Sequence, residues 1–243
     1  MEERIYDLVY EVEERHWWFR GRRAVIEALL ERTQPPTHSR RARILDAGCG
    51  TGRNLELYSR FGRAEGVDPS PQAVEYCRRR GLTAVREGDA QSLPFEDGRF
   101  GLIAATDVLE HVLDDAAALR EMHRVAAPGA SLLVTVPAYE WLWSREDVRL
   151  EHHRRYSLGG LRRTAAAAGW EPRFGTYFNL ILLPPIAIAR KLPSDADAEP
   201  ELERTSAALD GVLSLPMRLE ARLIRWGLRL PAGVSVGLVC RRS

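Results

Sequence analysis

Short apolar runs alternate with amphipathic stretches through the middle of the chain. The clearest buried strand is Leu-Leu-Val-Thr-Val at 132–136, where apolar residues follow one another without a helical period. The expected strands lie at 43–47, 64–68, 83–87, 100–106, 131–137, 170–178 and 234–240. The expected helices of this region lie at 52–61, 70–80, 114–126 and 157–168. This alternation with short loops predicts a parallel sheet with helices on both faces.

Two regions lie outside this pattern. Residues 1–33 predict one or two helices, and 34–41, with two prolines, predicts a linker. Residues 179–231 exceed a simple turn between the last two strands, and they contain a helical pattern that we expect to break or kink at Pro216. The expected division is a leader or lid with its linker at 1–41, a core at 42–178, a helical insertion at 179–231 and a last core strand at 232–243.

The first expected strand ends in a glycine-rich loop. Residues 43–52 read RILDAGCGTG, so Asp46 precedes Gly48, Gly50 and Gly52. Glycine allows a sharp turn and a close ligand approach, and the following helix directs its first N–H groups at the loop. The spacing is neither the dinucleotide fingerprint nor a nucleoside-triphosphate loop, because the third glycine comes one position early and no Gly-Lys-Ser/Thr follows. An acid beside the loop favours a ligand with a cationic amino group.

Acidic residues also end the next expected strands. Asp68 lies 20 residues beyond Gly48, where a βαβ nucleotide fold places a carboxylate for ribose hydroxyls. Asp89 follows the third strand, and Asp107 opens the segment Asp-Val-Leu-Glu-His at 107–111 after the fourth. Parallel strands end at one edge of a sheet, so these acids are expected to line one crevice.

Together these motifs resemble the class I S-adenosylmethionine-dependent methyltransferases, in the small-molecule group with an Asp-Val-Leu-Glu-His segment. The resemblance is strongest over 43–137. It implies a Rossmann-like, seven-stranded, mostly parallel α/β sheet in the order 3-2-1-4-5-7-6 with an antiparallel last strand. It also implies S-adenosyl-L-methionine as cofactor. The implied cofactor-binding residues are Asp46, Gly48, Cys49, Gly50, Gly52, Asp68, Pro69, Asp89, Ala90, Gln91 and Asp107.

Each part of the cofactor has an expected partner. Asp46 and the glycine loop are assigned to the methionine end. Asp68 is assigned to the ribose hydroxyls, since a carboxylate accepts from two neighbouring donors. Asp89, with the backbone of Ala90 and Gln91, is assigned to the adenine amino group. The alternative is that these acids only cap strand ends.

Three interpretations compete for Asp107, Glu110 and His111 at the mouth of the sheet. The acids could bond local backbone while the histidine packs under the cofactor. His111 could instead be a general base near neutral pH. The third is a divalent metal site, because ubiquinone O-methyltransferases carry an acid, a glutamate and a histidine at corresponding positions. Relatives without a metal requirement share Leu-Glu-His, so we expect no metal.

A second chemical cluster is Glu-His-His-Arg-Arg-Tyr-Ser at 151–157. Similar runs occur in bacterial methyltransferases of this group. His152 or His153 could deprotonate the acceptor and the arginines could hold an anionic group. Alternatively, one histidine and the tyrosine anchor the loop. The substrate-binding candidates are Trp18, Arg20, Tyr139, Trp143, Arg155 and Tyr156.

The leader contains the unusual run His-Trp-Trp-Phe-Arg-Gly-Arg-Arg at 16–23. Consecutive side chains on a helix diverge by about 100°, so three aromatics cannot all face one core. In the resembling group such a leader lies over the cofactor and substrate cleft. The alternative is an amphipathic helix packed on the sheet edge.

Composition narrows the class of partner. The formal net charge is +1, which argues against nucleic acid, and three scattered cysteines fit reduced thiols. The first residues lack a secretory pattern, so we expect a cytoplasmic protein. The most apolar run, 180–189, is too short to span a bilayer.

A basic amphipathic helix is expected at 217–230. Its apolar side chains adjoin arginines spaced three or four residues apart, at Arg218, Arg222, Arg225 and Arg229. It could dock on an anionic membrane or a carrier, or it could cover the sheet with its arginines in water.

The sequence thus predicts an S-adenosylmethionine-dependent methyltransferase that acts on a small, partly apolar metabolite at oxygen, nitrogen or carbon. One alternative is a methyltransferase for a lipid, isoprenoid-quinone or carrier-linked substrate at a membrane surface. The other is a cofactor-binding scaffold without catalysis.

Overall fold

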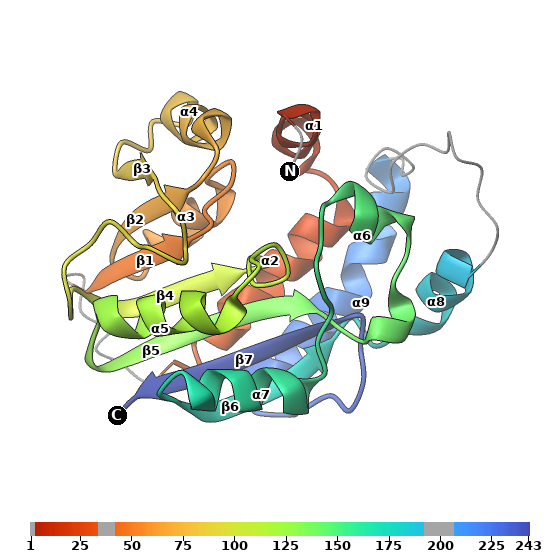
Figure 1. Cartoon of the computed structure of the whole chain (residues 1–243). Coiled ribbons are helices and arrows are strands. Elements are labelled where there is room, and N and C mark those ends of the chain that lie inside the picture. Colours follow the sequence, from red (N-terminus) through yellow and green to blue (C-terminus); the bar gives the residue numbers. More distant parts are fainter. Residues whose placement is uncertain (1–2, 34–41, 192–206) are drawn as a thin grey trace.

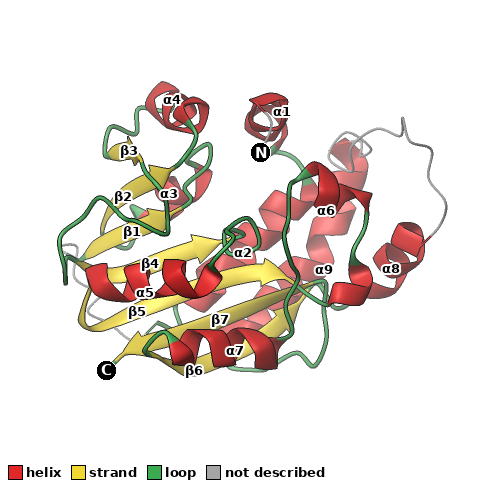
Figure 2. Ribbon diagram, in the orientation of Figure 1, coloured by secondary structure: helices red, strands yellow, loops and turns green. Residues whose placement is uncertain are grey.

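A computed structural model describes residues 3–33, 42–191 and 207–243. Over these residues one sheet has seven strands in the order β3-β2-β1-β4-β5-β7-β6 (Figures 1 and 2). The strands are β1 (Arg43–Ala47), β2 (Arg63–Asp68), β3 (Val85–Glu87), β4 (Phe100–Thr106), β5 (Ala126–Pro137), β6 (Trp170–Phe178) and β7 (Ser235–Arg242). Strands β1 to β5 pair in parallel, whereas β7 runs antiparallel to β5 and to β6. The predicted fold class and strand order are confirmed.

Helices cover both faces of the sheet. Those described are α1 (Glu3–Val12), α2 (Trp17–Leu30), α3 (Arg53–Tyr58), α4 (Pro71–Arg79), α5 (Asp115–Val125), η1 (Glu140–Leu142), α6 (Arg145–Arg149), α7 (Leu158–Ala167), α8 (Leu183–Lys191) and α9 (Ala207–Arg225). Helices α5 and α7 lie on one face, and α2 and α9 on the other (Figure 1).

Alternation along β4 shows why both faces are buried. Ile103 and Ala105 pack in the cluster under α5 and α7, while Leu102 and Ala104 pack in the cluster under α2 and α9. Side chains on a strand point to opposite faces in turn. A strand covered on both faces is therefore apolar throughout, as this one is.

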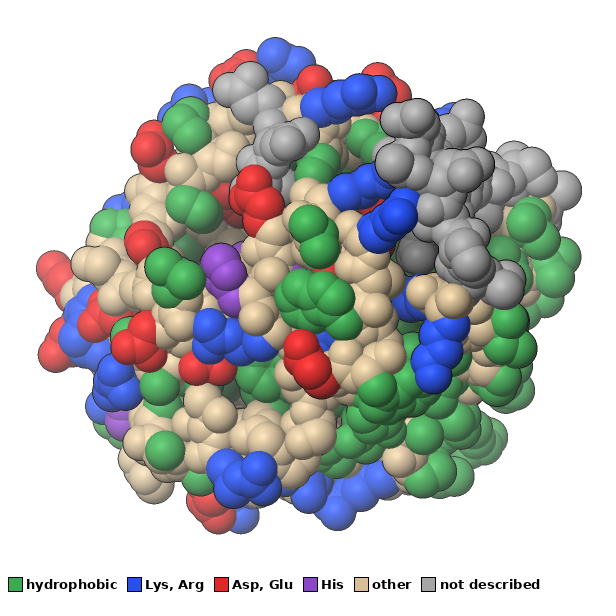
Figure 3. All heavy atoms as spheres, turned by 45° about the vertical axis from the view of Figure 1, so that its right-hand side comes forward, with side chains coloured by type: hydrophobic (Ala, Val, Ile, Leu, Met, Phe, Trp, Pro, Cys, Tyr) green, Lys and Arg blue, Asp and Glu red, His purple; other side chains and the backbone are tan. Residues whose placement is uncertain are grey.

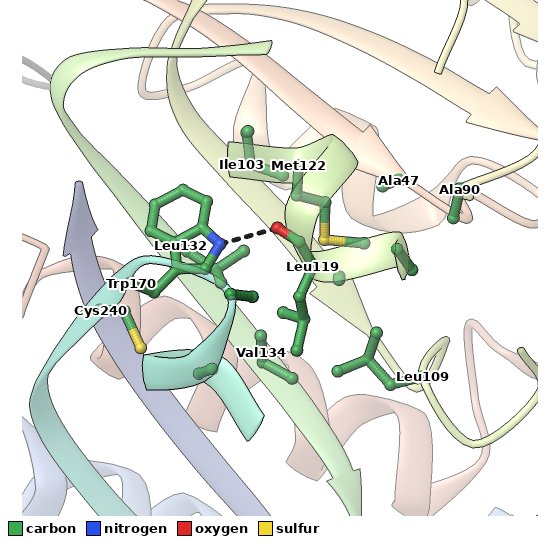
Figure 4. Packing of buried hydrophobic residues seen from close by; sticks show 14 of the residues in the cluster. Ala47, Ala90, Ile103, Leu109, Leu119, Met122, Leu132, Val134, Trp170 and Cys240 are labelled. Atoms are coloured by element: carbon green, nitrogen blue, oxygen red, sulfur yellow. Dashed lines mark hydrogen bonds between the residues drawn. The ribbon is translucent and has the colours of Figure 1, made fainter. Parts of the chain in front are cut away.

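One hydrogen bond ties the α5 layer to the sheet. Trp170, at the start of β6, is 2% exposed, and its indole Nε1 donates to the carbonyl of Leu119 on α5 at 3.0 Å (Figure 4). A buried indole N–H needs such a partner. The bond fixes α5 and the edge strand relative to each other.

The additional helices differ from the expected pattern at two points. Helix α9 continues through Pro216 without the break that was one of the two expected outcomes there. It ends at Arg225, so the basic helix expected at 217–230 stops before Arg229. An interior proline costs about 3 kcal/mol, but the next turns bury Met217 and Ile224 fully. Met217 lies against Gly21 of α2, where a Cβ would come 2.6 Å from the methionine sulfur, so the two helices approach closely. Burial on this face offsets the missing hydrogen bond.

Two expected segments fall outside the described residues. They are the linker at 34–41 and the part of the insertion at 192–206. Among the helices that are described, none combines the length and the apolar character needed to cross a membrane.

Candidate functional site

The glycine loop after β1 is folded back onto β2. The N–H groups of Gly48 and Cys49 both donate to the carbonyl of Val67, at 2.7 and 2.9 Å. Gly48 has φ of +82°, and a Cβ there would come 2.4 Å from a methyl group of Val108. Only glycine adopts this backbone at low cost in so tight a space. By contrast, the space beside Gly50 is open.

The other side of the loop packs into the protein. Cys49 is buried, with its sulfur 3.9 Å from that of Cys77 on α4. A Cβ on Gly52, which begins α3 with φ of +87°, would meet Leu82 and Cys77 at 2.7 and 2.8 Å. The Cys49 side chain therefore belongs to the core, and only its backbone lies at the loop.

Asp68, at the end of β2, closes the loop. Its carboxylate accepts from the N–H of Gly50 at 2.8 Å, from the N–H of Ser70 at 3.0 Å and from the hydroxyl of Tyr6 at 3.3 Å. Burial raises its pKa, and the first two of these hydrogen bonds oppose that rise. The neighbouring Pro69 is exposed. Asp68 thus lies where the β1 and β2 ends meet.

Asp46, at the end of β1, is the most unusual group in the site. Its side chain is 1% exposed, yet neither carboxylate oxygen has a hydrogen-bond partner among the described residues. Burial raises its pKa well above the ordinary value, Asp68 adds to the rise and Arg22 opposes it. An unpaired buried carboxylate is costly. A ligand ammonium group would supply the missing donors, so these residues fit the methionine end of S-adenosylmethionine.

Helix α1 lies over the loop. Thr51 donates its hydroxyl to Glu13 at 2.6 Å, and Arg80 binds the same carboxylate at 2.6 Å. Arg80 also stacks on the ring of Tyr10, 4.5 Å from its centroid. These contacts, with Tyr6 on Asp68, hold the leader against the predicted cofactor site.

Asp107 follows β4 with φ of +57°. It pairs with Arg22 of α2 and accepts from the hydroxyl of Thr135 at 3.0 Å. The guanidinium of Arg22 therefore reaches the carboxyl edge of the sheet from the leader. Its effect on Asp46 shows one cation among the acids at the carboxyl ends of the strands.

The predicted adenine residues form a short turn after β3. Asp89 is exposed and accepts from the N–H of Gln91 at 2.8 Å, while Ala90 is buried. The side chain of Gln91 in turn accepts from the N–H of Asp114 at 3.2 Å. The turn lies beyond β3, one strand further from the centre of the sheet than Asp68.

The segment after β4 meets the segment after α6. The rings of His111 and His152 lie edge to face with centroids 4.7 Å apart. One ring nitrogen of each and a carboxylate oxygen of Glu110 lie within 4.8 Å of one another. Burial and the charge of His152 lower the pKa of His111 to about 4. Burial, then Asp107, raise the pKa of Glu110 well above its ordinary value.

We expect methyl transfer to need no divalent metal at this cluster. Burial raises the pKa of Glu110, so a cation would have to compete with protonation of this carboxyl group. Activity, once an acceptor is known, should be unchanged by EDTA. Loss of turnover on chelation and its recovery with Mg²⁺ would contradict this expectation.

The two histidines at 152 and 153 differ sharply in environment. His152 is 9% exposed, and its Nδ1 lies 2.8 Å from Asp147 of α6. His153 is exposed, and its backbone N–H donates to the carbonyl of Glu110 at 2.7 Å. Arg155 is buried and binds Asp147 through Nε at 2.8 Å and Nη2 at 3.0 Å. The arginine predicted to bind substrate is therefore paired inside the protein.

Tyr156 is likewise engaged internally. Its hydroxyl donates to Asp115 at 2.7 Å and lies 3.2 Å from the carbonyl of Leu109. Its backbone hydrogen-bonds with Pro137 and Tyr139. It joins the segment at 151–157 to the ends of β4 and β5.

Aromatic residues surround this segment. The ring of Tyr139 stacks between those of Trp141 and Tyr177, with centroids at 5.6 and 5.0 Å. Trp143 is half-buried. In the space-filling view, a histidine side chain lies at the edge of a hollow in this face (Figure 3).

The two leader residues predicted to bind substrate, Trp18 and Arg20, lie in different environments. Trp18 packs on the sheet, with its ring stacked 6.4 Å from that of Phe178. Arg20, two positions later on α2, is exposed.

Three residues of the site escaped the sequence analysis. They are Tyr6, Arg22 and Asp147. Arg22 belongs to the basic and aromatic run at 16–23, and this run was the one sequence feature that could have indicated it. Ser144 and Asp147 have the spacing of a capping box, and the structure shows both of its hydrogen bonds. Tyr6 has no local signal.

Comparisons with known proteins agree with this geometry. Residues 45–134 match the family model of the methyltransferase domain. Norajmaline N-methyltransferase of Rauvolfia serpentina is 36% identical over 37% of this chain, and the match spans about a third (34%) of that relative. Ajmaline N-methyltransferase of the same plant is 25% identical over 91% of this chain and 83% of the relative. A solved S-adenosylmethionine-dependent methyltransferase of Mesorhizobium loti has a TM-score of 0.58 at 18% identity, with 88% of this chain and 96% of that one covered.

These findings define the class. The chain carries a class I methyltransferase domain, whose cofactor is S-adenosylmethionine, and the recognition from its motifs is confirmed.

Proposed function

We propose that this protein transfers a methyl group from S-adenosylmethionine to a small, partly apolar acceptor. The observation that carries the proposal is the buried, unpaired carboxylate of Asp46 beside a glycine loop that Asp68 closes. The cofactor supplies an already activated methyl group. The chain's own task is then to hold the acceptor in line with it, about 3–3.5 Å away, and to exclude water.

The leader has the contacts of a lid over the cofactor site. Tyr6 occupies one oxygen of Asp68, the carboxylate assigned to the ribose. Glu13, directly after α1, accepts from Thr51 of the loop and pairs with Arg80 at the end of α4. Exchange of the tyrosine hydroxyl for ribose hydroxyls would couple cofactor binding to the position of α1.

Replacing Asp68 with alanine tests the proposal. We expect S-adenosylhomocysteine affinity to fall roughly 10-fold to 100-fold, because two charge-assisted hydrogen bonds are lost. Titration calorimetry on the purified variant measures this. Tyr6→Phe removes the lid contact but leaves the carboxylate, so its affinity should be equal to or higher than that of the wild type. Undiminished binding by Asp68→Ala would contradict the assignment.

A second candidate function is methylation at a membrane surface. Along α9 the exposed apolar side chains Val212, Leu215 and Leu219 follow a three- and four-residue spacing, and Trp226, directly after the helix, is exposed as well. Exposed Arg218 and Arg222 adjoin this stripe. Hydrophobic side chains also gather on one side of the molecule, with Lys and Arg side chains at their edges (Figure 3).

This candidate predicts binding to anionic lipid. The protein should sediment with vesicles that contain phosphatidylserine, and not with phosphatidylcholine alone. Reversing Arg218 and Arg222 to glutamate should weaken binding by about 1 kcal/mol or more per residue, in a salt-sensitive way. The matched control reverses two exposed arginines away from α9, Arg63 on β2 and Arg78 on α4. Equal loss in both double variants would reject docking through α9.

A further inference from the structure

Asp147 joins two side chains that no sequence pattern connects to it, those of His152 and Arg155. It is 1% exposed, lies 2.8 Å from Nδ1 of His152 and accepts from both Nε and Nη2 of Arg155. The backbone N–H of Ser144 donates to it as well, at 2.8 Å. Hydrogen bonds from Ser144 and Arg155 therefore fix the position of the carboxylate independently of His152.

The charge on this carboxylate decides the state of His152. Burial opposes ionisation, but the hydrogen bond from His152 and the charge of Arg155 outweigh it and hold the pKa of Asp147 well below its ordinary range. An ionised carboxylate only accepts hydrogen bonds. In the neutral ring of His152 the proton therefore belongs on Nδ1, and the lone pair is on Nε2.

The ring of His152 lies at the functional edge of the sheet. It packs edge to face on His111, which follows β4. The strands β1, β2 and β4 end at this edge, where Asp46 and Asp68 lie. The titratable groups in contact with the ring are Asp147, His111 and Glu110. Asp107 and His153 act on the neighbouring His111, and Arg155 and Arg190 lie on the side of Asp147.

The other two candidate histidines are less suited to remove a proton. Burial lowers the pKa of His111 to about 4, so it is a weak base at neutral pH. His153 is exposed, and its backbone N–H is bound to Glu110. Of the three, His152 has the buried anionic partner that stabilises an imidazolium.

We propose that His152 is the general base of this enzyme and that Asp147, fixed by Arg155, is the positioning residue that orients it. This inference rests on the proposed methyl transfer. As the acceptor bonds to the methyl carbon and the carbon–sulfur bond breaks, the acceptor's proton passes to Nε2. The sulfonium becomes a neutral thioether, and His152 becomes an imidazolium beside Asp147. The proton then leaves to water.

Nitrogen-15 NMR of the histidine rings tests the dyad without any acceptor. In the wild type we expect the neutral ring of His152 to carry its proton on Nδ1, and His152→Gln assigns the signals. In Asp147→Asn this single tautomer should be lost, because an amide can donate as well as accept. A proton on Nε2 of the wild-type ring would overturn the proposal, even where Asp147→Asn fails to fold.

Turnover supplies the second arm. Transfer of labelled methyl groups to a panel of phenols and aromatic amines should fall about 100-fold or more in His152→Gln and Asp147→Asn. Imidazole should restore activity to His152→Ala. The matched control, His123→Gln on α5, should behave as the wild type. Loss in His153→Gln instead would overturn the assignment.

The two proposals fail separately. Binding of S-adenosylhomocysteine should be unchanged in His152→Gln. Absence of binding by the wild type would refute the proposed function, while the NMR result would still decide whether the dyad exists.

Discussion

Gly48→Ala should lose S-adenosylhomocysteine binding by about 100-fold or more, which corresponds to roughly 2.7 kcal/mol. The new Cβ would lie 2.4 Å from a methyl group of Val108, a short and stiff side chain. Val108 belongs to the segment between Asp107 and His111, so relief of the clash would displace both the loop and that segment. The residue would also be held at φ of +82°.

The control isolates the site from the strain. Gly98 has φ of +66°, and a Cβ there meets only one carbonyl oxygen, at 3.9 Å. It precedes β4, whereas Asp107 follows β4, so the two residues lie at opposite ends of the same strand. Gly98→Ala therefore carries the same kind of backbone strain, about 1–2 kcal/mol, but should bind S-adenosylhomocysteine as the wild type does. Equal losses in both variants, measured by calorimetry, would mean that Gly48 acts only on stability.

The central fold could be predicted because its signals are local. Apolar runs such as 132–136 identify buried strands, and the alternation of strands and helices determines a parallel sheet. Residues at strand ends then share one edge whatever the details of packing. This is why Asp46, Asp68 and Asp107 could be expected together before any contact was known.

The contacts that complete the site are non-local. Tyr6 meets Asp68 across 62 residues, and Arg22 meets Asp107 across 85. No period or spacing encodes such pairs, because they depend on how α1 and α2 lie across the finished sheet. Asp147 is closer in sequence to its partners, but a separation of five residues from His152 matches neither a helical face nor a strand face.

The same limit explains the aromatic run of the leader. Its residues divide between several tasks. His16 accepts from the N–H of Trp18 and begins α2, Phe19 is buried, and Trp18 stacks on Phe178 at the end of β6. The side chains diverge as a helix requires, but the sequence alone did not show which surface each would cover.

Asp46→Asn should have opposite effects on cofactor affinity and on the stability of the ligand-free protein. The wild-type carboxylate is buried without a hydrogen-bond partner among the described residues. Loss of its bond to a ligand ammonium should weaken S-adenosylhomocysteine binding about 10-fold to 100-fold, as expected for a charge-assisted hydrogen bond. The ligand-free variant should melt at a higher temperature, because a neutral amide is cheaper to bury than a carboxylate.

The pH dependence of stability distinguishes the specific effect of the buried Asp46 carboxylate from a general effect of removing one negative charge. Folding raises the pKa of Asp46, so the stability that its protonated form contributes is present below the ordinary carboxyl pKa and is lost as pH rises through the folded value. The gain from Asp46→Asn should therefore be larger at about pH 8 than at about pH 5. Glu96→Gln, at an exposed acid, is the charge-matched control and should show neither effect. A variant that is less stable than the wild type at both pH values would mean that the ligand-free protein satisfies Asp46 in another way.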